Sequence, residues 1–557
     1  MPFEYFVNGK RVSLPVNPNM IAVRFRESSD AGARRAVIDP KREVGSFDDR
    51  YEVPNEKLTV VGVASPDQPG PARVAAAATA LNADPDVELV TPVFDLGVKQ
   101  VIATDRVLVG FKPETSEKAD EIIKDYGGEV IEARDDEYVV KLKPNADPFD
   151  VIADLTKRAE VDYAEPDFVT IGQHRPRRKP AGANPVEPSA GEGGPIKDAG
   201  SNPALSAPGK SKTGFSRVGM AATATAATAT ASAGADPLRQ FQYALRLTRA
   251  VEAWDIVTPS AGIKVAVLDE GVDITHPDLA NAVKGTFDAI DGDVDQRPNS
   301  WDGHGTACAG LAVAIPNNAQ GIRGIAGGCS LLAARIAFSP SQNADWLTTN
   351  SKIRNAIDWA WRNGADILSN SWGGGAPSSA IINAFERARN QGRNGKGSVV
   401  IVAAGNESGP IDFPGNLPNV LTVSASNEFD EPKTRTSADG EHWWGSNFGP
   451  EVDIAAPGVH NYTTDISGEG GYNPGGNLDS NYVSDFNGTS SATPIVAGVA
   501  ALVLSANPNL REAQVRRILK QTADKVGQVV YTNGRNDQMG NGRVNAAKAV
   551  ETAASLV

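Results

Sequence analysis

Cysteine is nearly absent from this sequence. The 557 residues contain only Cys308 and Cys329, so a framework of disulfides cannot hold the fold together. These two residues are either buried thiols or one local bridge, and we predict thiols. A chain of this length exceeds a single core of usual size, which predicts two to four domains.

Basic residues are in the minority. Lys and Arg together number 54 against 68 for Asp and Glu, which gives a net charge of −14. This excess of negative charge argues against nucleic acid as a partner, because binding to phosphates requires a positive surface. It is compatible with bound divalent cations.

Long hydrophobic runs are lacking as well. Residues 1–19 are interrupted by charged side chains and have no continuous apolar core, so they do not resemble a secretory signal. The longest apolar runs, 399–404 and 495–506, are too short to span a bilayer, and we interpret them as a buried strand and a buried helix. We therefore expect no membrane partner and, for the sequence as given, a cytoplasmic location.

Two segments, 20–97 and 106–172, share one pattern of strands and helices. In the second we expect strands at 106–111, 129–131, 138–142 and 161–170, with helices at 116–126 and 149–159. In the first we expect strands at 21–25, 58–63 and 87–94, with a helix at 72–81. The order strand, helix, strand, strand, helix, strand is typical of a small ferredoxin-like α+β unit. The alternative is a chance similarity of two α+β segments.

The composition changes between residues 173 and 235. A basic cluster at 174–180 is followed by many Pro, Gly and Ser residues and by an Ala/Thr tract at 221–231. Such a segment cannot bury enough apolar surface to offset its ordering entropy, so we predict a mobile linker that proteases can cut.

From residue 236 to the end, short apolar runs alternate with helical patterns. This alternation predicts an α/β fold, a parallel sheet with helices on both faces. Active residues of such sheets lie at the carboxyl ends of the strands. The rule selects Asp269, after the run 263–268, and Asn406, after the run 398–403.

A further candidate, Ser490, lies where small residues precede the apolar run 495–504. The expected helix would hold Ser490 at its N-terminus, where free N–H groups stabilise negative charge. An oxyanion forming beside Ser490 would meet those groups, as acyl transfer requires. An ordinary capped helix is the alternative for this window alone.

Three windows point to one chemistry when they are taken together. Asp269 lies in VAVLDEGVDITHPDL, His304 in DGHGTACAG and Ser490 in NGTSSATP, which gives a carboxylate, an imidazole and a hydroxyl in the order Asp, His, Ser. Of the five histidines, only His304 is followed by Gly-Thr and a run of small residues. Over residues 236–555 the chain resembles the subtilisin-like serine peptidases, whose catalytic residues have this order.

The resemblance implies a role for each residue. Ser490 would be the nucleophile, His304 the general base and Asp269 the group that orients the imidazole. Asn406, in VIVAAGNES, matches the oxyanion-hole side chain of the family. An extended substrate would pair with the segment SNSWGGG, which contains Ser371, Trp372 and Gly373.

The same matching places Glu407 and Asp412 near the pocket that receives the side chain before the scissile bond. Two carboxylates there would favour Lys or Arg. The alternative is that both are solvated loop acids.

The segment VAIPNNAQGIRGIAG resembles the family's calcium loop. The implied ligands are the carbonyl oxygens of Pro316, Gln320 and Ile322, the side chain of Asn318 and the carboxylate of Asp278, with Asp236 as a sixth. An all-oxygen set of this kind suits Ca²⁺ better than Mg²⁺ or Zn²⁺.

The segments RVLVGFKP and VDYAEPDFV resemble the inhibitor propeptide of the family. We therefore expect four parts: 1–100, a degenerate propeptide copy that acts as a second chaperone or docking module; 101–172, an inhibitor-type propeptide; 173–235, the linker; and 236–557, the catalytic domain. The first self-cleavage would fall at about residues 172–179, and the propeptide would act as an intramolecular inhibitor.

These observations predict a calcium-stabilised serine endopeptidase, made as a self-inhibited precursor, that hydrolyses protein or peptide substrates. One alternative is a catalytically silent binding or scaffolding protein with the same fold. Another is hydrolysis shifted to esters or to one dedicated intracellular partner. Since the family is mostly exported, secretion is the alternative to a cytoplasmic location.

Overall fold

The computed structural model describes residues 3–26, 31–38, 44–63, 70–97, 99–144, 146–172, 235–342, 344–473 and 480–556. The predicted linker, apart from residue 235, and the predicted cleavage region beyond Gly172 lie outside these ranges.

The N-terminal part begins with a hairpin and continues with two units of one topology. The hairpin joins β1 (Phe3–Val7) to β2 (Lys10–Leu14). The first unit contains β3 (Val16–Phe25), α1 (Ala31–Ile38), β4 (Val44–Val53), β5 (Leu58–Val63), α2 (Gly70–Asn82) and β6 (Val87–Leu96). The second contains β7 (Lys99–Phe111), α3 (Ala119–Asp125), β8 (Glu129–Arg134), β9 (Glu137–Lys141), α4 (Pro148–Leu155) and β10 (Val161–Gly172). The strands pair as β6-β3-β5-β4 in the first unit and β10-β7-β9-β8 in the second, so the predicted repeat is confirmed.

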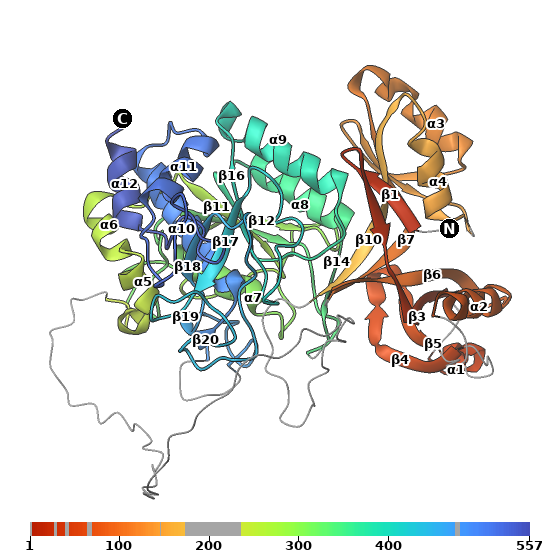
Figure 1. The fold of residues 1–557 in the computed structure, drawn as a ribbon, viewed down its shortest axis with the longest axis horizontal. Helices are drawn as coiled ribbons and strands as arrows, with labels where there is room; N and C mark the ends of the chain where they lie inside the picture. Colours follow the sequence, from red (N-terminus) through yellow and green to blue (C-terminus); the bar gives the residue numbers. More distant parts are fainter. Residues whose placement is uncertain are drawn as a thin grey trace, which may run out of the picture. The chain divides into compact units, whose positions relative to one another are not determined.

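The two units form one sheet that also takes in a strand of the C-terminal part. β6 pairs antiparallel with β7, with Val93 opposite Ile102. β10 pairs antiparallel with β14 (Trp346–Thr349), and Figure 1 shows these two strands side by side. The result is a nine-stranded sheet.

The C-terminal part is built on a seven-stranded parallel sheet, as predicted. Its order is β12-β13-β11-β15-β16-β17-β18. The strands are β11 (Lys264–Asp269), β12 (Val283–Asp288), β13 (Ser330–Arg335), β15 (Ile367–Asn370), β16 (Val399–Ala403), β17 (Leu421–Ser426) and β18 (Ile454–Pro457). A separate antiparallel pair joins β19 (Asn461–Thr464) to β20 (Tyr482–Phe486).

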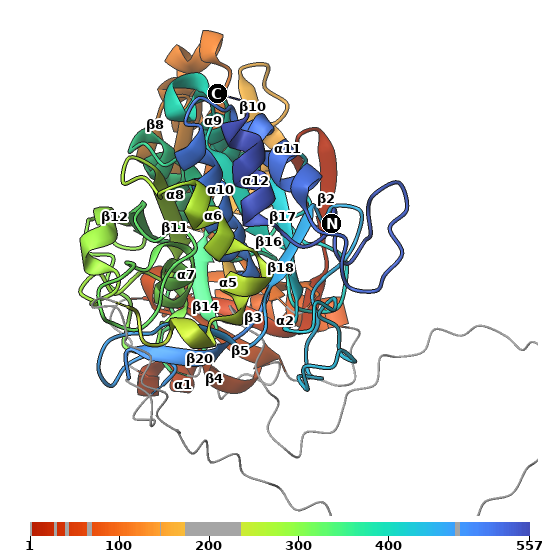
Figure 2. The same ribbon diagram turned by 90° about the vertical axis from the view of Figure 1, so that its left-hand side faces the viewer.

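Helices cover both faces of this sheet because alternate strand residues point to opposite sides. Val265 and Val267 face one apolar cluster, and Ala266 and Leu268 face another. The first cluster holds α5 (Tyr243–Leu247), α6 (Ala250–Ile256), α7 (His304–Val313), α10 (Thr489–Ala506), α11 (Glu512–Thr522) and α12 (Ala546–Ala554). The second holds α8 (Asn350–Arg362) and α9 (Ser379–Gly395), and Figures 1 and 2 show the two groups on opposite sides.

The second cluster continues into the N-terminal part. Phe94 and Phe168, both fully buried, belong to the same apolar cluster as Trp372 and Phe385 of the C-terminal part. Burial of this kind is the main favourable term in docking two folded layers. The N-terminal units are thus packed against the helices α8 and α9 that cover one face of the parallel sheet.

The helix α10 is longer than the apolar run suggested. Its 18 residues are long and apolar enough to cross a bilayer by length and composition, but 89% of that window is buried inside the structure. It is the central helix of the C-terminal part. Cys308 and Cys329 are buried free thiols, which confirms the prediction for both.

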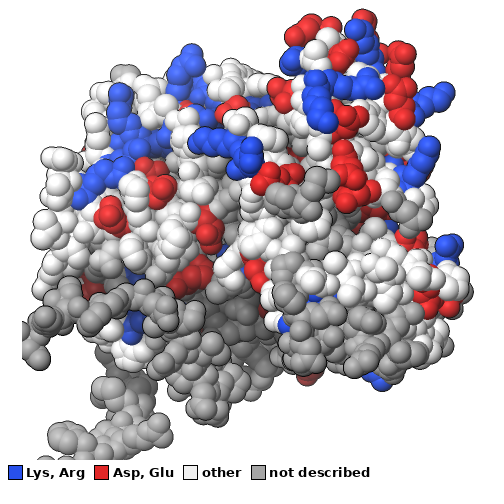
Figure 3. Space-filling model, turned by 45° about the vertical axis from the view of Figure 1, so that its right-hand side comes forward, with Lys and Arg blue, Asp and Glu red and all other residues white. Residues whose placement is uncertain are grey.

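Figure 3 shows one face of the molecule, on which acidic and basic side chains are interspersed and form no single acidic patch. Over the second unit they form pairs such as Arg158 with Asp125, 3.1 Å apart. Exposed pairs of this kind contribute little stability, about 0–1 kcal/mol each.

Candidate active site

Asp269 and His304 meet at the carboxyl edge of the parallel sheet. Asp269 is the last residue of β11 and His304 the first of α7, and His304 Nδ1 lies 2.8 Å from Asp269 Oδ1. Both side chains are buried. The close approach depends on Gly305, since a Cβ there would lie 2.2 Å from the carbonyl oxygen of Gly271.

The carboxylate changes the protonation of the imidazole. Burial opposes the charged form of His304, but the negative charge and hydrogen bond of Asp269 outweigh it and raise the pKa of His304 well above its ordinary value. An imidazolium formed at this position is therefore stabilised.

Ser490 lies in the first turn of α10, after Gly488 at the N-cap. Pro494 has no N–H, so the carbonyl of Ser490 lacks the usual helical donor four residues on. That carbonyl accepts instead from Ser371 Oγ at 3.0 Å, and Ser490 Oγ donates to the carbonyl of Ser371 at 3.0 Å. This reciprocal pair ties the serine to the residue that follows β15.

Cys308 contacts both the imidazole of His304 and the backbone of Ser490. Its Sγ is 3.8 Å from His304 Nδ1 and donates to the carbonyl of Ser490 at 3.5 Å. One sulfur thus contacts the imidazole of His304 and the backbone of Ser490, which brings the two residues into one region. The sequence predicted a buried thiol at Cys308 but not this contact, although the i+4 spacing places Cys308 and His304 on one helix face.

Asn406 lies three residues beyond the end of β16. Its Oδ1 accepts from the backbone N–H of Thr489 at 2.9 Å and from Thr489 Oγ1 at 3.1 Å. A backbone N–H can only donate, so this bond fixes which end of the amide faces Thr489. The Nδ2 donor is turned the other way.

Asn406 and Ser490 line one pocket together with all five residues predicted to bind substrate. The lining consists of Lys99, Ser371, Trp372, Gly373, Gly374, Ala403, Ala404, Gly405, Asn406, Glu407, Asp412, Thr489 and Ser490. Lys99 was not predicted, because it comes from the N-terminal part and no local pattern marks it.

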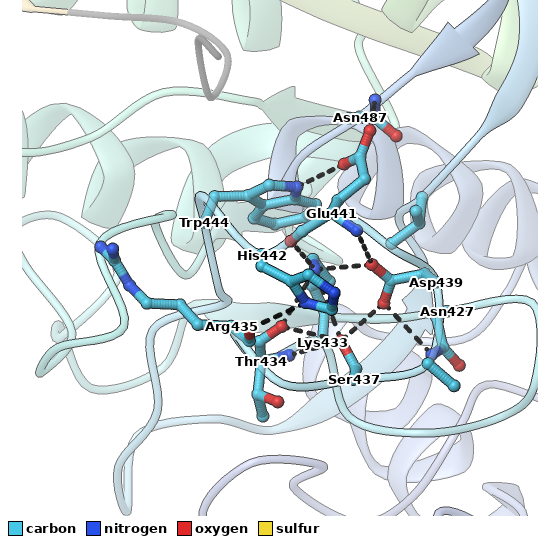
Figure 4. A network of polar contacts seen from close by, with 12 residues as sticks. Asn427, Lys433, Thr434, Arg435, Ser437, Asp439, Glu441, His442, Trp444 and Asn487 are labelled. Carbon is cyan, nitrogen blue, oxygen red and sulfur yellow. Dashed lines mark hydrogen bonds and ion pairs between the residues drawn. The ribbon is translucent and has the colours of Figure 1, made fainter. Parts of the chain in front are cut away.

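A buried polar network supports the loop before Ser490 (Figure 4). Lys433 is fully buried, and its ammonium lies 2.8 Å from Asp439 and donates to the carbonyl of Glu441 at 2.6 Å. The Glu441 carboxylate accepts from Trp444 Nε1 at 2.5 Å and from Asn487 Nδ2 at 2.9 Å. Asn487 is thus fixed three residues before the serine, a role that no local sequence pattern indicates.

Four of the predicted calcium ligands, Asp236, Asp278, Asn318 and Ile322, lie close together. Asp278 Oδ1 accepts from Asn318 Nδ2 at 2.6 Å, and Asp278 Oδ2 accepts from Ile322 N at 3.0 Å and Tyr482 OH at 2.9 Å. Asp236 accepts from the backbone of the same loop, including Asn318 N at 3.1 Å. Burial and, among weaker influences, the nearby Asp278 carboxylate raise the pKa of Asp236. Two buried carboxylates beside a loop of carbonyl oxygens are a donor set that fits a divalent cation.

Comparison with known proteins agrees with this geometry. The sequence model of the Subtilase family matches residues 260–542, about half of the chain. The chain belongs to the subtilase family. A second model, of the fervidolysin N-terminal prodomain, matches residues 99–167, which span β7 to the middle of β10. This subtilase therefore carries a prodomain of that kind.

Its relatives are subtilisin-type serine proteases. Thermitase of Thermoactinomyces vulgaris is 36% identical over 311 residues, which are 56% of this chain and 96% of thermitase. The calcium-dependent protease of Nostoc sp. is 36% identical over 338 residues, 54% of this chain and 48% of that protein. The chain is accordingly a hydrolase of the subtilisin type, and it spans about half the length of the calcium-dependent protease.

A solved structure shares the fold of both parts. The structure of fervidolysin from Fervidobacterium pennivorans aligns with 81% of this chain and 61% of that chain, at 23% identity and a TM-score of 0.55.

Proposed function

We propose that this subtilase cleaves peptide bonds with Ser490 as nucleophile, His304 as general base and Asp269 as the orienting carboxylate. The observation that carries the proposal is the 2.8 Å contact between His304 Nδ1 and Asp269 Oδ1, with Cys308 Sγ 3.8 Å from the same Nδ1 and 3.5 Å from the carbonyl oxygen of Ser490. Asp269 holds the proton on Nδ1, which leaves Nε2 to accept the proton of Ser490 during attack on the scissile carbonyl. His304 then returns that proton to the leaving amine, and water releases the acyl group from Ser490 by the same steps.

Charge on the reacting oxygen needs donors already in position. The Nδ2 group of Asn406, turned away from Thr489, and the backbone N–H of Ser490 at the start of α10 are the proposed pair. Donors that are fixed before the reaction stabilise the oxyanion without reorganisation.

Substrate would enter as an extended strand beside Ser371, Trp372 and Gly373. Its side chain before the scissile bond would enter the pocket that Glu407 and Asp412 line. Two carboxylates that line the pocket favour Lys or Arg, because a cationic side chain forms charge-assisted hydrogen bonds with them.

We further propose a structural Ca²⁺ held by the Asp278 and Asp236 carboxylates, the Asn318 side chain and the carbonyls of Pro316, Gln320 and Ile322. The donor set supports this, and relatives named calcium-dependent protease are consistent with it. When bound, the ion would neutralise the two carboxylates and fix loop 316–322.

The chain is proposed to be a self-processed precursor with four parts: 1–100, 101–172, 173–235 and 236–557. Support comes from the docking of the prodomain strand β10 on the C-terminal part through β14. In this arrangement the prodomain assists folding and inhibits the enzyme until it is removed.

Reaction with a fluorophosphonate tests the proposal. The activated protein is expected to carry one label on Ser490, and Ser490→Ala is expected to carry none, while the neighbouring control Ser491→Ala is labelled normally. Peptide mapping of the labelled protein identifies the residue. A folded and processed protein that takes no label at Ser490 would support the catalytically silent alternative.

A further inference from the structure

The turn between β6 and β7 carries a lysine into the proposed substrate pocket. Lys99, the first residue of β7, has a side chain only 7% exposed, and its Nζ lies 3.6 Å from Glu407 Oε1. The same side chain lines the pocket that contains Asp412 and Ser490. A positive charge from the prodomain therefore sits where the proposed function expects the side chain of a substrate.

The pocket wall is shaped to admit this side chain. A Cβ at Gly374 would lie 2.0 Å from Lys99 Cδ and 2.2 Å from its Nζ. Gly374 also has a φ of +86°, which side-chain-bearing residues rarely adopt. The aliphatic stem of Lys99 thus passes over a position in this wall that has no room for a side chain.

The Lys99 ammonium affects the pKa of a carboxyl group in the pocket. Burial raises the pKa of Asp412, the Lys99 ammonium opposes that rise, and the Glu407 carboxylate adds to it. Lys99 therefore supplies positive charge beside the two carboxylates that line the pocket, Glu407 and Asp412.

The strand ends beside Lys99 are held in place independently of the pocket. Lys99 pairs with Leu96 in the β6–β7 ladder, and Asp95 accepts from Asn17 Nδ2 at 2.9 Å and from Gln100 Nε2 at 3.2 Å. Because the backbone of Lys99 is already engaged in this hairpin, it presents its side chain without the extended segment that a cleaved substrate needs.

We propose that the β6–β7 hairpin is an inhibitory plug, in which Lys99 occupies the pocket that binds a Lys or Arg side chain of the substrate. The plug is distinct from the end of β10, which leads to the predicted cleavage region. It depends on the first repeat, because β6 supplies one arm of the hairpin, and this gives residues 1–100 a role. The inference rests on the proposed function and deepens it by naming what the pocket binds.

The first experiment measures latency in the full chain. A fluorogenic peptide with Lys before the scissile bond reports the initial rate and the lag before full activity. The variants are Lys99→Met, which keeps the stem but removes the charge, Lys99→Arg, and Lys118→Met as a matched control, since Lys118 is 53% exposed and pairs with Glu160. The plug predicts an initial rate about tenfold higher or more in Lys99→Met, which corresponds to the loss of one charge-assisted contact. Lys99→Arg and Lys118→Met should keep the native lag.

The second experiment does not require catalysis. In full-length Ser490→Ala, binding of benzamidine, a small cation, is measured by calorimetry with and without Lys99→Met. The plug predicts binding only in the double variant, and further addition of Glu407→Gln should abolish it. Equal lag in Lys99→Met and wild type, or equal benzamidine binding with and without Lys99, would overturn the plug. Absence of fluorophosphonate labelling would instead overturn the proposed catalysis, so the two failures are distinguishable.

Discussion

At the scale of single residues, close contact between backbones sets the geometry of the site. Gly305 lets α7 approach the turn after β11, where its missing Cβ would lie 2.2 Å from Gly271 O and 3.0 Å from Asp269 Cβ. Both neighbours are anchored near the backbone and cannot rotate away. The distance between Asp269 and His304 therefore depends on a residue that takes no part in the chemistry.

The substitution Gly305→Ala should separate these two elements. We expect a loss of about 2 kcal/mol or more in the free energy of unfolding, a typical cost of overpacking, and a failure of self-processing. Gly409→Ala is the matched control, because a Cβ there meets nothing within 4 Å. Denaturant unfolding and gel analysis of processing measure both effects; a Gly305→Ala protein with native stability and processing would contradict this explanation.

The amide of Asn406 gives a second prediction at this scale. Asn406→Ala should lower kcat by about 10²–10³-fold, because one donor to the developing oxyanion is lost. KM should change little, since the contact strengthens only in the transition state. A kcat within a factor of three of wild type would show that Asn406 does not belong to the oxyanion hole.

At the scale of elements, the last prodomain strand caps the N-terminal ends of two helices of the catalytic part. Glu165 of β10 is fully buried and accepts from Ser378 Oγ at 2.5 Å and from Ser379 N at 2.7 Å, at the start of α9. Asp167 accepts from Ser351 N at 2.9 Å and Ser351 Oγ at 2.7 Å, in the first turn of α8. Carboxylates at helix N-termini accept hydrogen bonds from the free N–H groups and interact favourably with the positive end of the helix dipole.

Burial makes one of these contacts sensitive to pH. It raises the pKa of Glu165 from 4.5 to about 7, although hydrogen bonds from Ser378, Ser379 and Ala380 act in the other direction. The folded state therefore keeps a proton that the unfolded state has lost. The contribution of Glu165 is fully present below pH 4.5 and is lost as the pH rises to about 7.

In full-length Ser490→Ala, the free energy of unfolding should accordingly decrease between pH 4.5 and 7, by at most about 1.4 kcal/mol per pH unit from this group. Glu165→Gln cannot titrate and should show a shallower pH dependence. Denaturant titrations at several pH values compare the two proteins. Parallel pH profiles would contradict the raised pKa.

Elements with a local pattern could be predicted from the sequence, and those stabilised only by distant partners could not. The second repeat, α10 and five of the seven parallel strands follow from apolar periodicity, whereas α1 and β4 of the first repeat and the parallel strands β12 and β18 were not predicted. The strand β14 has no such signal, because it is held as an edge strand by β10, about 180 residues earlier in the chain. The three proposed catalytic residues lie in distinctive local windows, whereas Lys99 and Glu165 reach their sites only through packing of the two parts.

At the scale of the whole molecule, the N-terminal and C-terminal parts share structure that the proposed activation would have to separate. They share one nine-stranded sheet and one apolar cluster, and Tyr5 OH of the first hairpin donates to the carbonyl of Pro377 at 2.6 Å. Cutting the chain after β10 would leave these contacts intact. We therefore expect cleavage and loss of inhibition to be two steps.

Calcium should stabilise the molecule as a whole. At a hundredfold excess over its Kd, a ligand of the folded state adds about 2.7 kcal/mol to the free energy of unfolding, so chelation should lower the Tm by several degrees. The Tm of Asp278→Asn should respond much less to calcium or chelator. Scanning calorimetry compares the two proteins. An equal change in Tm in both would show that Asp278 does not bind the ion.

The central claim is that Ser490, activated by His304 and Asp269, cuts this chain itself. The intact mass of the purified protein tests it most directly. The wild-type chain is predicted to yield two fragments cut near residues 172–179, and Ser490→Ala to remain whole under the same conditions. Normal cleavage of Ser490→Ala at that site would contradict the account.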